Sequence, residues 1–133
     1  MSTLQRLKLV DPKGIQTHGA RIVGQLDLSF TTVSFPLAFQ NARFAQDINL
    51  AHAHLTSVDL TGTQTRGITA YYVIVRDDVL LRYGFSAEGE VNLSQAQLGG
   101  NLECDGGRFK NPGSYALDAD SLKAYSVFLR NGF

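Results

Sequence analysis

Two histidines at alternate positions offer the first possible site of chemistry. His52 and His54 would lie on the same side of a strand, where two imidazoles can form part of a metal-binding set. The repeat pattern described below places Ala53, between them, inside the fold. Both imidazoles should then point outward, and we expect a solvated pair rather than a metal site.

Aspartates are paired at two further places, Asp77-Asp78 and Asp118 with Asp120. Paired carboxylates can bind a cation or carry general acid–base catalysis. Asp also accepts hydrogen bonds from backbone N–H groups at corners, and this is the role that we expect here. We therefore predict no catalytic, cofactor-binding or metal-binding residue, and keep six surface candidates. They are His52, His54, Asp77, Asp78, Asp118 and Asp120.

The common cofactor and nucleophile motifs do not occur in the sequence. It contains no G-x-G-x-x-G, no P-loop, no G-x-S-x-G and no H-E-x-x-H, so no cofactor is predicted. Cys104 is the single cysteine, and we expect it to be a small buried hydrophobe rather than a reactive thiol. Tyr71-Tyr72 would suit a sugar-binding surface, but we expect a corner that packs against its neighbour.

Composition limits the classes of partner. The 133 residues correspond to one domain, and Lys+Arg and Asp+Glu are both 12, so the net charge is zero. A neutral chain lacks the usual electrostatic signature of a nucleic-acid or anionic-membrane binder, and we predict no nucleic-acid partner. No apolar run approaches the roughly 20 residues that span a bilayer, and the N-terminus lacks the apolar stretch of a signal peptide. We expect a cytoplasmic protein with no integral membrane segment.

The elements that would position these residues follow a short apolar repeat. Leu26-Asp27-Leu28 and Leu102-Glu103-Cys104 alternate apolar and polar residues, which is the period of a strand. The same apolar spacing occurs in 15–33, 37–55 and 91–109. A short repeat of this kind indicates a solenoid, in which each coil buries its apolar row only against the neighbouring coils.

Between Ile48 and Gly62 the repeat becomes strictly five-residue. Leu50, Leu55 and Leu60 follow one another at this interval, and a smaller or β-branched residue often stands two places before. This segment resembles the pentapeptide-repeat family, whose fold is a right-handed, four-sided parallel β-helix. Six-residue steps elsewhere, such as 22–28, predict a less regular cross-section.

A longer repeat of 48 residues links Val79–Phe85 to Val127–Phe133, which corresponds to about two coils. The stretch from Gly84 to Phe133 resembles a group of uncharacterised bacterial proteins with pentapeptide-like β-helices, often labelled membrane-associated oxidoreductases. The resemblance covers 14–85 more loosely. It implies the fold and supplies no catalytic residue.

The predicted fold is therefore all-β: a right-handed parallel β-helix of five to six coils. Residues 1–14 would cap its first coil, as a helical turn or an edge strand. Residues 15–133 would form the solenoid, which either continues beyond Phe133 or is truncated there. The predicted core is Ile15, Ile22, Leu26, Leu28, Val33, Leu37, Phe39, Phe44, Ile48, Leu50, Leu55, Val58, Leu60, Val91, Leu93, Leu98, Leu102, Cys104, Phe109, Val127 and Leu129.

Two function classes remain. The first is a non-enzymatic structural or interaction module that presents a face of the helix to a protein partner, with end-to-end self-association as a further possibility. The second is an enzyme or glycan binder with a site in an outer groove, or an accessory scaffold of a membrane-associated oxidoreductase. Convergence of Asp77, Asp78, Asp118 and Asp120 in one cleft would favour the second class.

Overall fold

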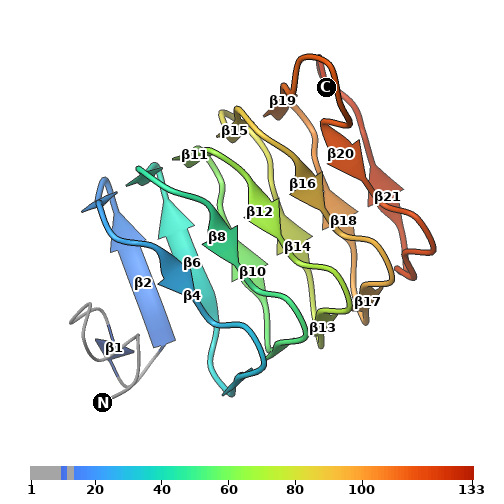
Figure 1. Ribbon diagram of the computed structural model, residues 1–133. Helices are drawn as coiled ribbons and strands as arrows, with labels where there is room; N and C mark the ends of the chain where they lie inside the picture. Colours follow the sequence, from blue (N-terminus) through green and yellow to red (C-terminus); the bar gives the residue numbers. More distant parts are fainter. Residues whose placement is uncertain (1–9, 12–13) are drawn as a thin grey trace.

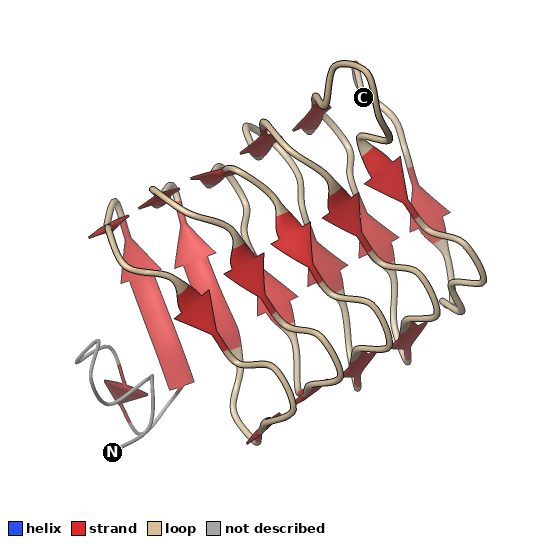
Figure 2. Ribbon diagram, viewed as in Figure 1, coloured by secondary structure: helices blue, strands red, loops and turns tan. Residues whose placement is uncertain are grey.

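The chain winds into a right-handed parallel β-helix with four sides (Figure 1). The computed structural model describes residues 10–11 and 14–133. In Figure 1 the chain rises through the more distant side, crosses the upper edge, descends in front and returns along the lower edge while it advances toward the C-terminus. About five such turns are stacked, and Figure 2 shows that the described residues form strands joined by turns, without a helix among them.

Four sheets form the four sides, and each complete coil contributes one short strand to each, except that the coil of β18–β20 meets sheet D only through the bridge between Gln97 and Lys123. Sheet A contains β1 (Val10–Asp11), β2 (Gly14–His18), β6 (Leu37–Gln40), β10 (Val58–Asp59), β14 (Val79–Leu80), β18 (Leu102–Glu103) and β21 (Val127–Phe128). Sheet B contains β3 (Arg21–Ile22), β7 (Arg43–Phe44), β11 (Gln64–Thr65), β15 (Ser86–Ala87) and β19 (Arg108–Phe109). Sheet C contains β4 (Leu26–Asp27), β8 (Ile48–Asn49), β12 (Ile68–Thr69), β16 (Val91–Asn92) and β20 (Leu117–Asp118). Sheet D contains β5 (Thr32–Val33), β9 (His54–Leu55), β13 (Ile74–Val75) and β17 (Gln97–Leu98).

The register stacks equivalent residues of successive coils. All described pairings are parallel except that of β1 with β2, which is antiparallel and joins Val10 to Ile15. Backbone hydrogen bonds continue past the strand ends, as from Leu50 N–H to the Thr69 carbonyl at 2.7 Å. Each coil is thus bonded to its neighbours around most of its circumference, and outward side chains form rows along the axis.

The interior is a continuous apolar column, as the alternation predicts. Leu28, Leu50 and Cys104 are each no more than 4 % exposed, and Ala53 is completely buried. The core also includes Val73, Val75, Val79 and Leu81 of the third and fourth coils. Of the predicted core, seventeen residues are buried and cluster there. They are Ile22, Leu26, Leu28, Val33, Leu37, Phe39, Phe44, Ile48, Leu50, Leu55, Val58, Leu60, Val91, Leu93, Leu98, Leu102 and Cys104.

The last coil corrects the prediction. Val127 and Leu129 are each 46 % exposed, and Phe109 is only partly buried, although all three were expected in the core. They follow the same pattern as Val79 and Leu81, but in the structure no further coil packs against β21. Burial of a solenoid residue requires a neighbour on both sides, so the pattern alone overstates it here. The side chain of Ile15 lies outside the described residues.

Two polar side chains inside the column are paired with the backbone. The Thr63 hydroxyl donates to the Phe39 carbonyl and accepts from the Ala42 N–H at 3.1 Å. The Thr65 hydroxyl lies 3.2 Å from the Gln46 carbonyl of the preceding coil. Each hydroxyl therefore links two coils, and its burial cost is offset by these bonds.

At the N-terminal end, the expected cap of residues 1–14 is described only in part. Strand β1 lies along the outer edge of β2, as an edge strand would, whereas residues 1–9 and 12–13 lie outside the described structure. Within the described residues, no helix is long and apolar enough to cross a membrane.

Candidate functional site

The corner between sheets C and D carries a ladder of aromatic rings, which we call the aromatic corner: Phe30, His52, Tyr71 and Tyr72. The imidazole of His52 stacks on Phe30 at 4.7 Å between ring centroids and on Tyr72 at 5.1 Å, with both pairs within 6° of parallel. Tyr71 meets the His52 ring edge-on at 5.5 Å and 85°. Such spacings match the strand separation of about 4.8 Å, so the coil rise itself sets the stack.

A tight turn positions each ring of the stack. The N–H of Ala53 donates to the Leu50 carbonyl at 3.1 Å, which closes the turn around His52. Phe30, His52 and Tyr72 each adopt the left-handed conformation, with φ of 59°, 58° and 59°. Bulky residues adopt this conformation at a cost of roughly 1–3 kcal/mol, and glycine would avoid it. An aromatic residue therefore occupies each of these positions although the backbone conformation there favours glycine.

Most of the aromatic corner faces solvent. Phe30 is 75 % exposed and Tyr72 is 53 % exposed, and Ile74 of β13 adds a further exposed apolar side chain beside them. Both faces of the His52 ring are covered by its neighbours, so a sugar cannot stack there. The outer edges of the rings remain as a rigid, amphipathic strip.

The two histidines lie close together but in different surroundings. His52 belongs to the ring stack, whereas the exposed His54 begins β9 in the outward row of sheet D, between Thr32 and Ile74. Ala53 between them points inward, as predicted. In the part of the chain that the structure describes, no group of three or more His, Cys, Asp or Glu side chains could hold a metal ion.

Asp118 and Asp120 have local roles at the corner after sheet C. An Asp118 carboxylate oxygen accepts a hydrogen bond from the Asp120 N–H at 3.0 Å. In the same way, the Ser29 N–H donates to Asp27 Oδ1 and the Ser94 N–H donates to Asn92 Oδ1. This repeated side-chain-to-backbone turn is the use of aspartate that the sequence analysis expects.

Asp77 and Asp78 occupy a different corner, between sheets D and A. An Asp78 carboxylate oxygen accepts from the Asn101 N–H at 2.7 Å, and Asp77 forms an exposed ion pair with Arg76 at 3.3 Å. With Asp59 they line an open groove of about 520 Å³ over sheet A. The four aspartates therefore do not converge in one cleft, because the second pair belongs to sheet C.

Asp59 is the carboxyl group of the groove over sheet A whose pKa is shifted by its surroundings. Burial opposes ionisation of Asp59, but hydrogen bonds from the Thr61 hydroxyl and N–H, and one from Gln40, lower its pKa overall. A carboxylate with a lowered pKa is a hydrogen-bond acceptor rather than a proton donor at neutral pH. The Asp59 carboxylate therefore stabilises the turn at Thr61.

Cys104 is completely buried, which raises the pKa of its thiol to about 12, with a smaller contribution from the charge of Asp105. The thiolate is the reactive form of cysteine, so this thiol is chemically silent in the folded protein. Its place in the core is the one predicted from the repeat.

The sequence analysis missed Phe30 as a functional residue. Phe30, His52 and Tyr72 each stand two residues after an inward position, at Leu28, Leu50 and Ala70. Alignment of the coils on those inward residues would have placed the three rings in one row. Spacing along the sequence alone separates them by 20 residues or more.

The comparisons with known proteins add no relative. No family model matches the chain, and neither the curated proteins nor the solved structures contain a match. The resemblance to pentapeptide-repeat proteins and to the bacterial oxidoreductase-labelled group stays a prediction.

Proposed function

We propose that this protein is a non-enzymatic interaction module that binds a protein partner through the aromatic corner. The observation that carries the proposal is the exposed stack of Phe30, His52 and Tyr72, held in a backbone conformation that disfavours bulky residues. Folding does not require large rings at these corners, because Gln95 and Ser121 occupy the equivalent positions of later coils with similar φ values of 60° and 56°.

The chemistry of the strip suits a protein surface. Tyrosine and phenylalanine are enriched in the buried centres of interfaces, where they supply large contact areas with few rotatable bonds. The stack is already ordered by the coils, so little conformational entropy is lost on binding. The partner would present a shallow apolar recess that accepts the ring edges and the exposed Ile74.

The candidate Asp and His side chains lie at separate places on the surface, and this supports an interaction module over an enzyme. Asp118 and Asp78 accept hydrogen bonds from backbone N–H groups of turns, His52 belongs to the aromatic corner and His54 lies in the outward row of sheet D. Each of these side chains thus has a structural or surface role that needs no substrate.

The test compares two double variants of the full chain in chemical crosslinking and pull-down from the native host. Phe30→Ser with Tyr72→Ser removes the ends of the stack, and Tyr115→Ser with Tyr125→Ser removes two exposed tyrosines of the last coil as a matched control. We expect one identifiable partner to be retained by the wild type and the control and lost by the corner variant. Equal capture by all three proteins would contradict the proposal.

A further inference from the structure

The outward face of sheet B carries two parallel rows of side chains, and half of these side chains are basic. The first row follows the register of the strands, with Arg21 opposite Arg43, then Gln64, Ser86 and Arg108. The second row lies two residues further along each coil. It contains Val23, Ala45, Arg66, Glu88 and Lys110. Together the rows hold five cations and one anion.

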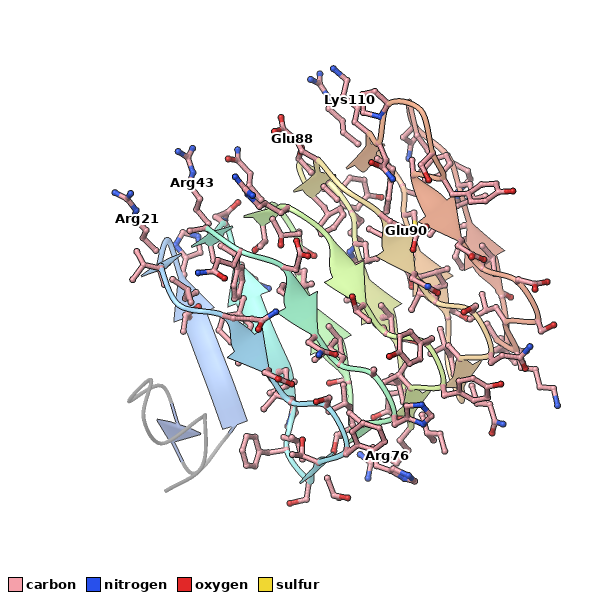
Figure 3. All side chains as sticks on the ribbon, viewed as in Figure 1. Arg21, Arg43, Arg76, Glu88, Glu90 and Lys110 are labelled. Carbon is pink, nitrogen blue, oxygen red and sulfur yellow. The ribbon has the colours of Figure 1, made fainter. Side chains whose placement is uncertain are left out.

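Figure 3 shows Arg21, Arg43, Glu88 and Lys110 projecting from the same upper edge of the molecule. Arg76 lies at the opposite edge and Glu90 lies on the front face. All five cations of sheet B are exposed. The four strand intervals between Arg21 and Arg108 give the rows a length of about 19 Å, at about 4.8 Å each.

The cations of sheet B are not neutralised by the fold. The ion pairs among the described residues are Arg76–Asp77, Arg82–Glu103 and Arg130–Asp105, and none involves sheet B. Arg21 and Arg43 are direct cross-strand neighbours, and like charges in this arrangement destabilise a sheet. Because these unpaired like charges do not stabilise the fold, we infer that they serve the binding of a negatively charged partner.

The zero net charge of the chain conceals this distribution. The two rows carry five positive charges and one negative charge, whereas Asp27 and Asp118 lie on sheet C and Asp59 and Glu103 lie on sheet A. Asp47 and Glu90 come directly before strands β8 and β16 of sheet C. The expectation against nucleic acid depends on total charge, and total charge does not describe a molecule whose charges are sorted by face.

We propose that sheet B binds the sugar–phosphate backbone of a nucleic-acid duplex, without sequence preference. Four of its five cations are arginines, whose planar fork matches a phosphate, and Gln64 and Ser86 continue the first row with further hydrogen-bond donors. A duplex carries a phosphate every 3.4 Å of its axis per strand, and because each strand winds around that axis only some of the phosphates along about 19 Å face one row.

A hollow between the rows gives room for a phosphate. Arg43, Gln64, Arg66, Ser86 and Glu88 line an open pocket of about 210 Å³ above the strands β7, β11 and β15. Two guanidinium groups, an amide and a hydroxyl face a single carboxylate there. The two rows contain no aromatic side chain on which unpaired bases could stack, and this favours a duplex over a single strand.

The test is fluorescence anisotropy of the full chain with a labelled DNA duplex of about 20 base pairs, at NaCl concentrations from about 50 to 200 mM. Contact of about four net charges with phosphates predicts a log–log salt slope of about −3.6, which is about a 150-fold loss of affinity over this range. Single-stranded DNA, poly-glutamate and phosphatidylserine vesicles serve as competing anions at the same salt.

Matched charge variants locate the binding. Arg43→Glu with Arg66→Glu should abolish duplex binding, and the milder Arg43→Gln should reduce the salt slope by about 0.9. Arg76→Gln on the opposite edge removes the same single charge from an exposed arginine and should leave affinity within about twofold. Circular dichroism and thermal melts confirm that each variant is folded.

Three results would overturn the assignment. The first is no duplex binding by the wild type at about 50 mM NaCl. The second is equal or tighter binding of poly-glutamate, vesicles or single strands. The third is a loss of binding in Arg76→Gln that equals the loss in the folded Arg43→Gln variant. None of these results bears on the aromatic corner, so the two proposals fail separately.

Discussion

Leu81 and Leu129 occupy the same inward position in coils that are two turns apart, and they should differ sharply when shortened to alanine. Both stand two residues after strand positions of sheet A, at Val79 and Val127. Leu81 is 1 % exposed, whereas Leu129 is 46 % exposed at the end of the stack. The sequence repeat predicts equal effects, and the structure predicts unequal ones.

The magnitudes follow from burial and packing. The column around Leu81 is closely filled, with a void of only about 10 Å³ that is lined by apolar side chains. Leu81→Ala therefore leaves a cavity that its neighbours cannot fill, and we expect a loss of about 2–5 kcal/mol in the free energy of unfolding. Leu129→Ala removes a half-exposed side chain and creates no closed cavity, so about 1 kcal/mol is expected.

The assay is guanidinium unfolding followed by far-UV circular dichroism and by tyrosine fluorescence, with coincident transitions as the condition for a two-state analysis. The reasoning would be refuted if Leu129→Ala cost as much as Leu81→Ala, since the last coil would then be covered in solution. A loss below about 1 kcal/mol for Leu81→Ala would equally refute the packed column.

Three further predictions concern single polar or reactive groups. Thr63→Val keeps the shape of the side chain but leaves its two backbone partners unpaired, so a loss of about 1–3 kcal/mol is expected in the same unfolding assay. Hydrogen bonds from Arg130 lower the pKa of Asp105, so their stabilising effect is complete above the ordinary value of 3.8 and disappears as the pH falls through the lower native value. Melts between neutral and acidic pH should therefore show a smaller acid-induced loss in Asp105→Asn than in the wild type. The thiol of Cys104 should react with Ellman's reagent only after unfolding, and fast reaction of the native protein would contradict its burial.

The fold could be predicted from the sequence because its core depends on a local rule. Alternation at Leu26-Asp27-Leu28 and its equivalents sets which side chains point inward, and that choice is fixed within three residues. The turn at 76–78 was predictable for the same reason, since a polar run interrupts the pattern between Val75 and Val79.

The surface could not be predicted in the same way. Phe30, His52 and Tyr72 meet only because the coils have the lengths that they have, and those lengths vary from 20 to 26 residues between register partners in sheet C. Arg21 and Arg43 become neighbours for the same reason. Which residues of neighbouring coils meet depends on the register of the strands. That register depends in turn on the length and conformation of every turn between them.

The exposure of Val127 and Leu129 marks the other limit of local reasoning. Their residues repeat those of Val79 and Leu81, so the sequence assigns them the same surroundings. Their burial depends on whether a further coil packs against them, and the sequence of one repeat does not contain that information.

The winding of four sheets around one axis also determines how such a molecule can evolve. Each circuit of the chain adds one rung to every side at once, so duplication or deletion of a circuit would lengthen or shorten all the sides by about 4.8 Å. The rest of the architecture would keep its pairings. Evolution can thus change the length of a binding face by whole coils. The residues that give the face its chemistry need not change.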